Sequence, residues 1–212
     1  MFDKIKYQEI KEKIQKTSIS TEIIAISKYH SRESVNQAIS CGVRIFGENR
    51  VLEAKNKFED ILSNNKEVKL HLTGPLQTNK VKQALKIFHV LHTIDREKLV
   101  NELCKFPDQI SKKKLFVQVN TGKEKNKSGV YPENLKNFLN FCKDKKVINI
   151  AGLMCIPPIN ENAFHHFKNL KQLAEENNLS ELSIGMSADY EEALPFKPSY
   201  IRLGSILFGE RD

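Results

Sequence analysis

The sequence predicts an α/β fold, a single (β/α)8 barrel with an extra helix at its N-terminus. Three observations lead to this prediction. Short apolar segments alternate with longer amphipathic segments along the chain, which indicates repeated βα units and a parallel sheet. Eight strand candidates are present, the number that closes a barrel. The 212 residues can bury one large core, but they leave room only for brief loops. A doubly wound open sheet is the alternative.

The strand candidates are short apolar runs, many of them rich in β-branched residues. Each is bounded by polar residues or by glycine and proline, which are typical of turns. In chain order the predicted strands are residues 22–27, 44–46, 69–72, 89–94, 115–119, 147–154, 182–184 and 200–203.

Helices are predicted where apolar residues recur at helical spacing. In the first of them, Ile5, Ile10 and Ile14 are expected to share the buried face. No helix is predicted after the last strand. In chain order the predicted helices are residues 3–16, 34–40, 49–62, 79–87, 96–106, 132–143, 162–177 and 189–194. No linker divides the chain, so residues 1–212 are expected to form one barrel domain.

The formal net charge of +8 comes from lysines that are interleaved with acidic residues, which favours a solvated surface. A binder of nucleic acid or another polyanion is a minor alternative, and steep salt dependence would reveal it. The absence of tryptophan disfavours a base-stacking platform. No run of 18 apolar residues and no apolar signal core occurs, so we expect no membrane span and a cytoplasmic protein.

The cysteines and the histidine doublet do not predict a metal site. No pair of cysteines has C-x-x-C spacing, and no histidine lies at ligand spacing from them. We expect Cys41, Cys104, Cys142 and Cys155 to be reduced and mostly buried. The two histidines at residues 165–166 are expected to lie on the surface or to pack in the core, and not to bind a ligand.

Lys28 is the first candidate for chemistry, because an apolar strand delivers it to the end of the barrel where active sites lie. An amine in a poorly hydrated pocket loses its proton more readily, and the free amine is the form that makes an imine with an aldehyde. The alternative interpretation is a lysine whose charged end simply reaches water at the end of a strand.

The segments after the last two predicted strands indicate a phosphate site. Gly185-Met186-Ser187 and Gly204-Ser205 offer glycines for close backbone approach and two hydroxyl groups. Barrels often bind phosphate at this position, although tight βα turns also need glycine. An amine that faces a phosphate cradle suggests pyridoxal 5′-phosphate, which requires both.

Motifs spread over residues 22–211 resemble the pyridoxal phosphate homeostasis protein family, whose members are pyridoxal phosphate-binding proteins similar to the N-terminal domain of alanine racemase. Glu53, Glu124 and Lys127–Gly129 accompany the motifs. One of these motifs would be a weak signal, whereas all of them in order are a strong one. The motifs are Ala25–Lys28, Phe46–Asn49, His71–Lys80, Gln118–Asn120, Gly152–Met154, Gly185–Asp189 and Arg202–Arg211.

The resemblance implies a single TIM barrel that holds pyridoxal 5′-phosphate as a Schiff base on Lys28. It implies that Ser187, Gly204 and Ser205 surround the phosphate and that Arg202 lies near the pyridine nitrogen. It also implies that Asn49, His71 and Asn120 line the pocket.

An arginine beside the pyridine nitrogen has a chemical consequence. A guanidinium only donates hydrogen bonds, so it cannot hand a proton to the ring as a carboxylic acid could, and the ring becomes a weaker electron sink. In alanine racemase-like enzymes a tyrosine from a second domain and the partner subunit acts as a second base on the opposite face of the cofactor. We expect no second domain here. Tyr29 is better interpreted as a wall residue.

The sequence therefore predicts a non-catalytic carrier that takes part in intracellular pyridoxal phosphate homeostasis. The alternative is a small amino acid racemase or another pyridoxal phosphate-dependent enzyme, with His71 or Tyr29 as the proton-transfer group. The expected partners are pyridoxal phosphate and pyridoxal phosphate-dependent apo-enzymes, with no nucleic acid and no membrane. A monomer is expected.

Overall fold

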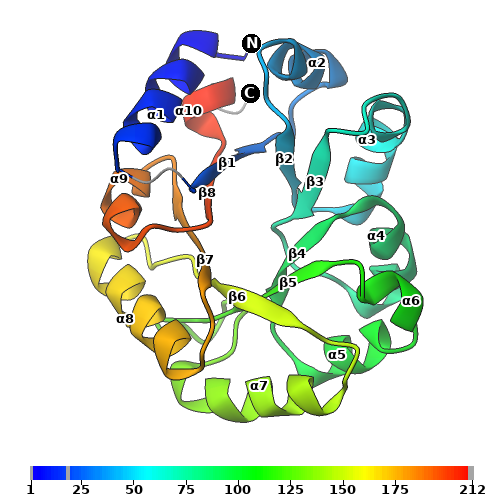
Figure 1. Ribbon diagram of the computed structural model, residues 1–212, viewed down its shortest axis with the longest axis vertical. Coiled ribbons are helices and arrows are strands. Elements are labelled where there is room, and N and C mark those ends of the chain that lie inside the picture. The colour runs from blue at the N-terminus through cyan, green and yellow to red at the C-terminus, as the bar shows by residue number, and fades with distance from the viewer. Residues whose placement is uncertain (1, 18–19, 210–212) are drawn as a thin grey trace.

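Eight parallel strands close into a barrel in the computed structural model, which describes residues 2–17 and 20–209 (Figure 1). The last strand pairs with the first, with Glu22 opposite Tyr200 and Ala25 opposite Leu203. The predicted barrel is confirmed, and the open-sheet alternative is wrong. The strands are β1 (Glu22–Ile26), β2 (Ile45–Glu48), β3 (Lys69–Leu72), β4 (Val90–Ile94), β5 (Lys114–Gln118), β6 (Ile150–Met154), β7 (Glu181–Met186) and β8 (Tyr200–Leu203).

Helices surround the barrel and cover its outer face (Figure 1). Short 3-10 turns at Thr78–Lys80, Pro132–Asn134 and Leu194–Phe196 accompany them. The α-helices are α1 (Lys4–Thr17), α2 (Arg32–Ser40), α3 (Val51–Asn64), α4 (Val81–Ile87), α5 (Glu97–Leu103), α6 (Pro107–Ile110), α7 (Leu135–Asp144), α8 (Ala163–Glu176), α9 (Tyr190–Ala193) and α10 (Ser205–Phe208). Within the described ranges no helix is long and apolar enough to cross a membrane.

The first helix buries a different stripe from the one predicted. Tyr7, Ile10 and Ile14 are buried, whereas Ile5 is 74% exposed. Positions 7, 10 and 14 share one face of a helix, but position 5 lies five residues from Ile10 and faces elsewhere. The buried face contacts α10, and the Asp3 N–H donates to the Leu207 carbonyl (2.8 Å).

Two apolar cores form, because alternate residues of each strand point to opposite sides of the sheet. The larger core lies between the strands and the helices. The smaller one fills the barrel interior and contains Ile24, Ile26, Val90, Phe116, Met154 and Tyr200. Gly47 also faces this interior, because a Cβ there would lie 2.4 Å from Ile26 Cδ1. The side chains of this smaller core fill the barrel interior below its mouth.

Candidate functional site

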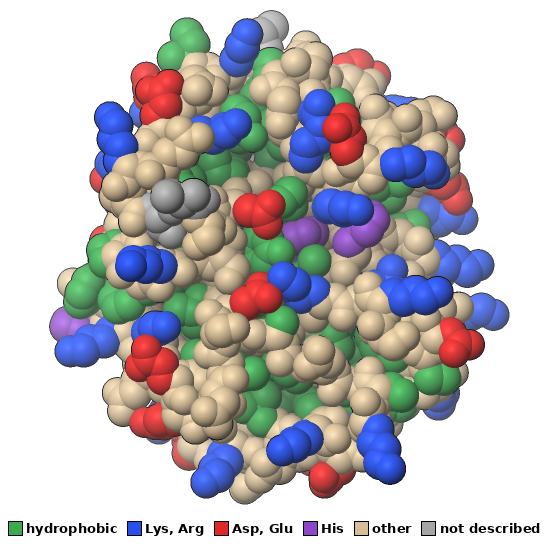
Figure 2. Space-filling model, viewed as in Figure 1, with side chains coloured by type: hydrophobic (Ala, Val, Ile, Leu, Met, Phe, Trp, Pro, Cys, Tyr) green, Lys and Arg blue, Asp and Glu red, His purple; other side chains and the backbone are tan. Residues whose placement is uncertain are grey.

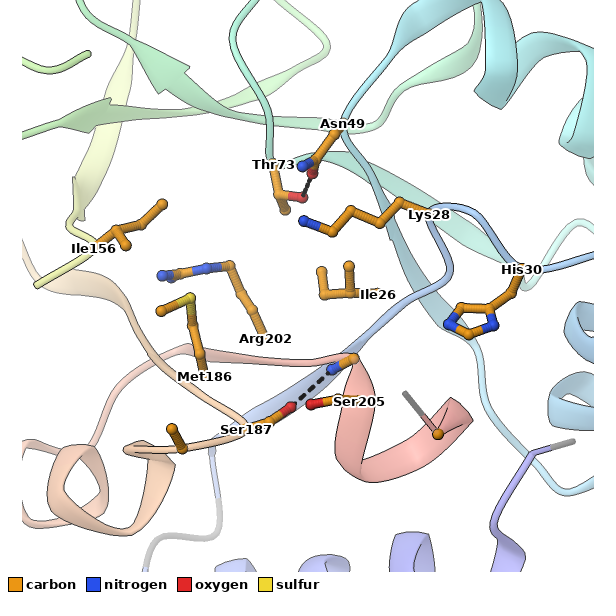
Figure 3. Close-up of a pocket in the computed structure, with 13 residues that line it drawn as sticks. Ile26, Lys28, His30, Asn49, Thr73, Ile156, Met186, Ser187, Arg202 and Ser205 are labelled. Carbon is orange, nitrogen blue, oxygen red and sulfur yellow. Dashed lines mark hydrogen bonds between the residues drawn. The ribbon is translucent and has the colours of Figure 1, made fainter. Parts of the chain in front are cut away.

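One pocket lies beyond the carboxyl ends of β1, β2, β3, β6, β7 and β8 and encloses about 310 Å³ (Figure 3). Lys28, Asn49, Ser187, Arg202, Gly204 and Ser205 line this pocket as predicted, whereas His71 and Asn120 do not. The convergence has a simple cause: in a parallel barrel all carboxyl ends meet at one rim. The lining residues are Ile26, Lys28, His30, Asn49, Thr73, Ile156, Met186, Ser187, Ala188, Arg202, Gly204, Ser205 and Gly209.

Lys28 stands two residues beyond the end of β1 and is half-buried. Figure 3 shows its side chain extended into the pocket, with the amine directed toward Thr73. The Thr73 hydroxyl donates to Asn49 Oδ1 (3.0 Å). This side of the pocket therefore combines an amine with two polar side chains.

Arg202 is 4% exposed, and the barrel wall holds its guanidinium in place. Nη1 donates to the Ser183 carbonyl (2.6 Å) and to Ser183 Oγ (2.9 Å), and Nη2 donates to the Cys155 carbonyl (2.9 Å). Burial lowers the pKa of Arg202 from its usual value, while the thiol of Cys155 and the carboxyl of Asp189 oppose the shift. Among the described contacts these three bonds leave the N–H of Nε and one N–H of Nη2 without an acceptor, so Arg202 can still donate to a ligand in the pocket.

Ser187 and the start of α10 form the opposite side of the pocket (Figure 3). Ser187 Oγ accepts hydrogen bonds from the backbone N–H groups of Gly204 (3.1 Å) and Ile206 (3.4 Å). Two N–H groups and the hydroxyls of Ser187 and Ser205 are therefore gathered in one concave place, an arrangement that favours an anion.

The two glycines of the predicted phosphate site lie in different surroundings. Gly185 has φ +87°, and a Cβ there would lie 2.9 Å from Ala193 Cβ, so the irregular end of β7, where the register with β8 shifts, requires glycine. Gly204 has negative φ, and its Cβ would lie 3.5 Å from Ile26 Cβ, which is an ordinary contact. Since Gly204 lines the pocket, that Cβ would occupy space next to the N–H groups. Backbone conformation and a close contact therefore explain Gly185, whereas the surroundings of Gly204 leave room for a Cβ.

His71 does not line the pocket, contrary to the position expected for it. It lies within β3, 2% exposed, and its Nδ1 is 3.1 Å from Nε2 of His92. Both rings pack against Tyr200, and His92 stacks on Phe116. Burial lowers the pKa of His71 to about 3 and that of His92 well below its usual value, so both are neutral near pH 7. Thr73, two residues further on, reaches the pocket instead.

The other sequence predictions meet mixed outcomes. Asn120 lines a neighbouring cavity and anchors its own loop, since Oδ1 accepts from the Glu124 N–H (3.1 Å). Tyr29 is 57% exposed and lines a separate surface pocket.

His30 and Ile156 line the candidate pocket, but the sequence did not predict them. Ile156 continues the inward alternation of Gly152 and Met154 beyond the strand, which is the signal that could have found it. Residues 210–211 of the last motif lie outside the described residues.

All four cysteines are free: Cys142 and Cys155 are buried, and Cys41 and Cys104 are half-buried. In the doublet, His166 is buried against Thr121 and Glu161, and His165 is exposed. No cluster of metal-ligating side chains occurs in the described part of the chain. Figure 2 shows lysines and arginines scattered among acidic side chains on the visible face rather than gathered in one patch.

Comparison with known proteins agrees with this geometry. Residues 4–212 match the family described as alanine racemase, N-terminal domain. The chain is 35% identical over 201 residues to the pyridoxal phosphate homeostasis protein of Aquifex aeolicus (strain VF5), which covers 90% of this chain and 87% of that relative.

Solved structures of PipY from Synechococcus elongatus PCC7942 have the same fold. The structure without pyridoxal phosphate has a TM-score of 0.86 at 31% identity and covers 95% of this chain and 99% of PipY. The structure with pyridoxal phosphate bound has a TM-score of 0.82 at 29% identity and covers 96% of this chain and 100% of PipY. The resemblance noted in the sequence is thus confirmed, and the chain belongs to the alanine racemase N-terminal domain family, among the pyridoxal phosphate homeostasis proteins.

Proposed function

We propose that this protein binds pyridoxal 5′-phosphate as a Schiff base on Lys28 and takes part in pyridoxal phosphate homeostasis without catalytic turnover. One observation carries the proposal: Lys28 stands on one side of a single pocket, and the N–H groups and hydroxyls at Ser187, Gly204 and Ser205 stand on the other (Figure 3). The names of the relatives and the pyridoxal phosphate in PipY support it.

The residues present fit the chemical groups of this cofactor. Its phosphate matches the place where the Gly204 and Ile206 N–H groups converge and where glycine leaves room. Its aldehyde matches an amine: nitrogen of Lys28 adds to the carbonyl carbon, and a C=N bond forms with loss of one water. Its pyridine nitrogen is an acceptor, which matches a donor from the buried Arg202.

The same residues support a carrier rather than an enzyme. Arg202 can donate to the ring nitrogen but cannot protonate it, which weakens the ring as an electron sink for chemistry at a substrate carbon. The two groups suggested for proton transfer are elsewhere: His71 is buried inside the barrel, and Tyr29 lines a separate surface pocket. Neither lines the pocket that contains Lys28.

The test is an absorbance spectrum of the purified protein with pyridoxal phosphate, before and after borohydride reduction. We expect a visible band that borohydride removes while it fixes the pyridoxyl group on Lys28, detected by peptide mass. Lys28→Ala should lack the band, whereas Lys55→Ala should keep it, because Lys55 lies on α3 with its side chain 44% exposed and pairs with Glu59. A wild-type protein without the band overturns the proposal. Steady racemisation of alanine or serine that depends on Lys28 would establish the enzyme instead.

A cytoplasmic location, a monomeric state and transfer of the cofactor to apo-enzymes remain predictions from the sequence. Analytical ultracentrifugation of the protein with and without pyridoxal phosphate tests the monomer. Mixing the loaded protein with a pyridoxal phosphate-dependent apo-enzyme, in the presence of a trap for free aldehyde, tests direct transfer.

A further inference from the structure

A buried carboxylate that does not line the pocket contacts Ser27, the residue before Lys28. Glu48 is the last residue of β2, and its side chain is fully buried. Its Oε1 accepts from Ser27 Oγ (2.7 Å) and from Lys57 Nζ (2.9 Å). Burial raises the pKa of Glu48, and the ammonium of Lys57 counteracts this rise. A charge placed this deep is costly unless paired, so its presence calls for an explanation.

Two charged side chains of α3 extend this pair to the backbone around Lys28. Lys57 Nζ also donates to the Ser27 carbonyl (2.8 Å), and Glu53 Oε1 accepts from the Tyr29 N–H (3.0 Å). Glu53 and Lys57 lie one helical turn apart on α3, with 3.7 Å between Oε1 and Nζ.

These contacts restrain the backbone on both sides of Lys28. The Ser27 carbonyl belongs to the peptide group before the Lys28 Cα, and the Tyr29 N–H belongs to the peptide group after it. Tyr29 has φ +68°, a left-handed conformation that is unusual for an aromatic residue and persists only where the surroundings hold it. The bond from the Tyr29 N–H to Glu53 is such a restraint. The backbone of Lys28 is therefore held on both sides by one helix.

We propose that three charged residues hold the Lys28 side chain in the direction needed to meet the aldehyde of pyridoxal phosphate. These positioning residues, which we call the α3 clamp, are Glu53 and Lys57 of α3 and their partner Glu48 of β2. The inference rests on the proposed Schiff base. Without the clamp the two peptide groups can rotate, and the amine spends less time within reach of the carbonyl carbon. The phosphate cradle belongs to β7, β8 and α10, so the clamp does not touch it.

Glu53 offers the sharpest variants, because its side chain is 28% exposed and its loss leaves the Glu48–Lys57 pair intact. Glu53→Ala removes the acceptor of the Tyr29 N–H, whereas Glu53→Gln keeps an oxygen there. Glu59→Ala is the matched control, because it removes an exposed carboxylate that pairs with Lys55 on the same helix.

Two measurements distinguish a loss of Lys28 positioning from a general disturbance of the pocket. Stopped-flow absorbance measures the rate of Schiff base formation with pyridoxal phosphate. Calorimetry measures the affinity for pyridoxine 5′-phosphate, an alcohol that keeps the ring and phosphate but cannot form an imine. We expect Glu53→Ala to slow Schiff base formation about tenfold with unchanged affinity for pyridoxine 5′-phosphate, and Glu53→Gln to restore most of the rate.

The inference is overturned if Glu53→Ala reacts as fast as Glu59→Ala, or if both readouts fall together. Absence of the band in the wild type is a different result, since it removes the proposed function itself. Lys57→Met provides a second variant, with its thermal melting curve recorded first. If it is folded, the same slow reaction with intact binding of pyridoxine 5′-phosphate is expected.

Discussion

Ser187 shows how one hydroxyl group prepares a site for an anion. Its oxygen accepts from the N–H groups of Gly204 and Ile206, and so directs to one point two donors that would have to turn from the hydroxyl to a bound phosphate. The sequence indicated this role through a glycine and a serine after each of the last two strands. It gave no sign that the hydroxyl itself organises the neighbouring loop, since that contact joins residues 17 positions apart.

We predict that Ser187→Ala weakens pyridoxal phosphate binding about tenfold, because one hydrogen bond to a charged group contributes about 1.5 kcal/mol. The wavelength of the Schiff base band should stay unchanged, since Lys28 is untouched. A spectrophotometric titration measures both quantities. Ser63→Ala removes an exposed hydroxyl on α3 and serves as the control. Wild-type affinity in Ser187→Ala would show that the phosphate does not depend on this side chain.

At the scale of elements, hydrophobic periodicity located the strands and most helices but missed two features. The segment expected as one helix over 96–106 is α5, ending at Leu103, and the separate α6 begins at Pro107. Proline suits a first helical turn because it lacks the N–H that an interior position would need. The four residues of α10 are too few to show a helical period.

Close approach of β6 to β7 leads to a prediction about Gly152. A Cβ there would lie 2.0 Å from the Glu181 carbonyl oxygen, and this neighbour is backbone that cannot turn away. Gly152 and Glu181 are also paired in the sheet. We expect Gly152→Ala to lower the free energy of unfolding by about 3 kcal/mol. Thermal melting should show a fall of about 6–12 °C. A melting temperature equal to that of the wild type would contradict the tight contact.

At the scale of the whole molecule, the buried pair of histidines links stability to pH. Unfolded histidine takes up a proton below about pH 6.5, but burial keeps His71 neutral until about pH 3. The unfolded state therefore binds more protons between these limits, and stability falls as pH falls. His71 alone should lower the free energy of unfolding by about 2 kcal/mol between pH 7.5 and 5.

Urea unfolding at a series of pH values tests this expectation. His71→Asn should flatten the dependence, whatever it does to stability at pH 7.5. His165→Asn, in which the lost ring is exposed, should keep the wild-type slope. An unchanged slope in His71→Asn would mean that His71 gains its proton in the folded state as readily as in the unfolded one.

Local spacing in the sequence predicts the order of strands and helices and the barrel, and the shared rim of parallel strands predicts where Lys28, Ser187 and Ser205 lie. The family resemblance adds Asn49 and Arg202. Features that depend on depth and on distant neighbours became visible only in the folded molecule. The tertiary structure placed His71 one layer below the pocket, because alternate inward residues of a strand fill successive layers. It also brought Glu53 and Lys57 to the peptide groups on either side of Lys28, and Glu48 to the Ser27 hydroxyl. These contacts join segments 21 to 30 residues apart, which no local pattern encodes.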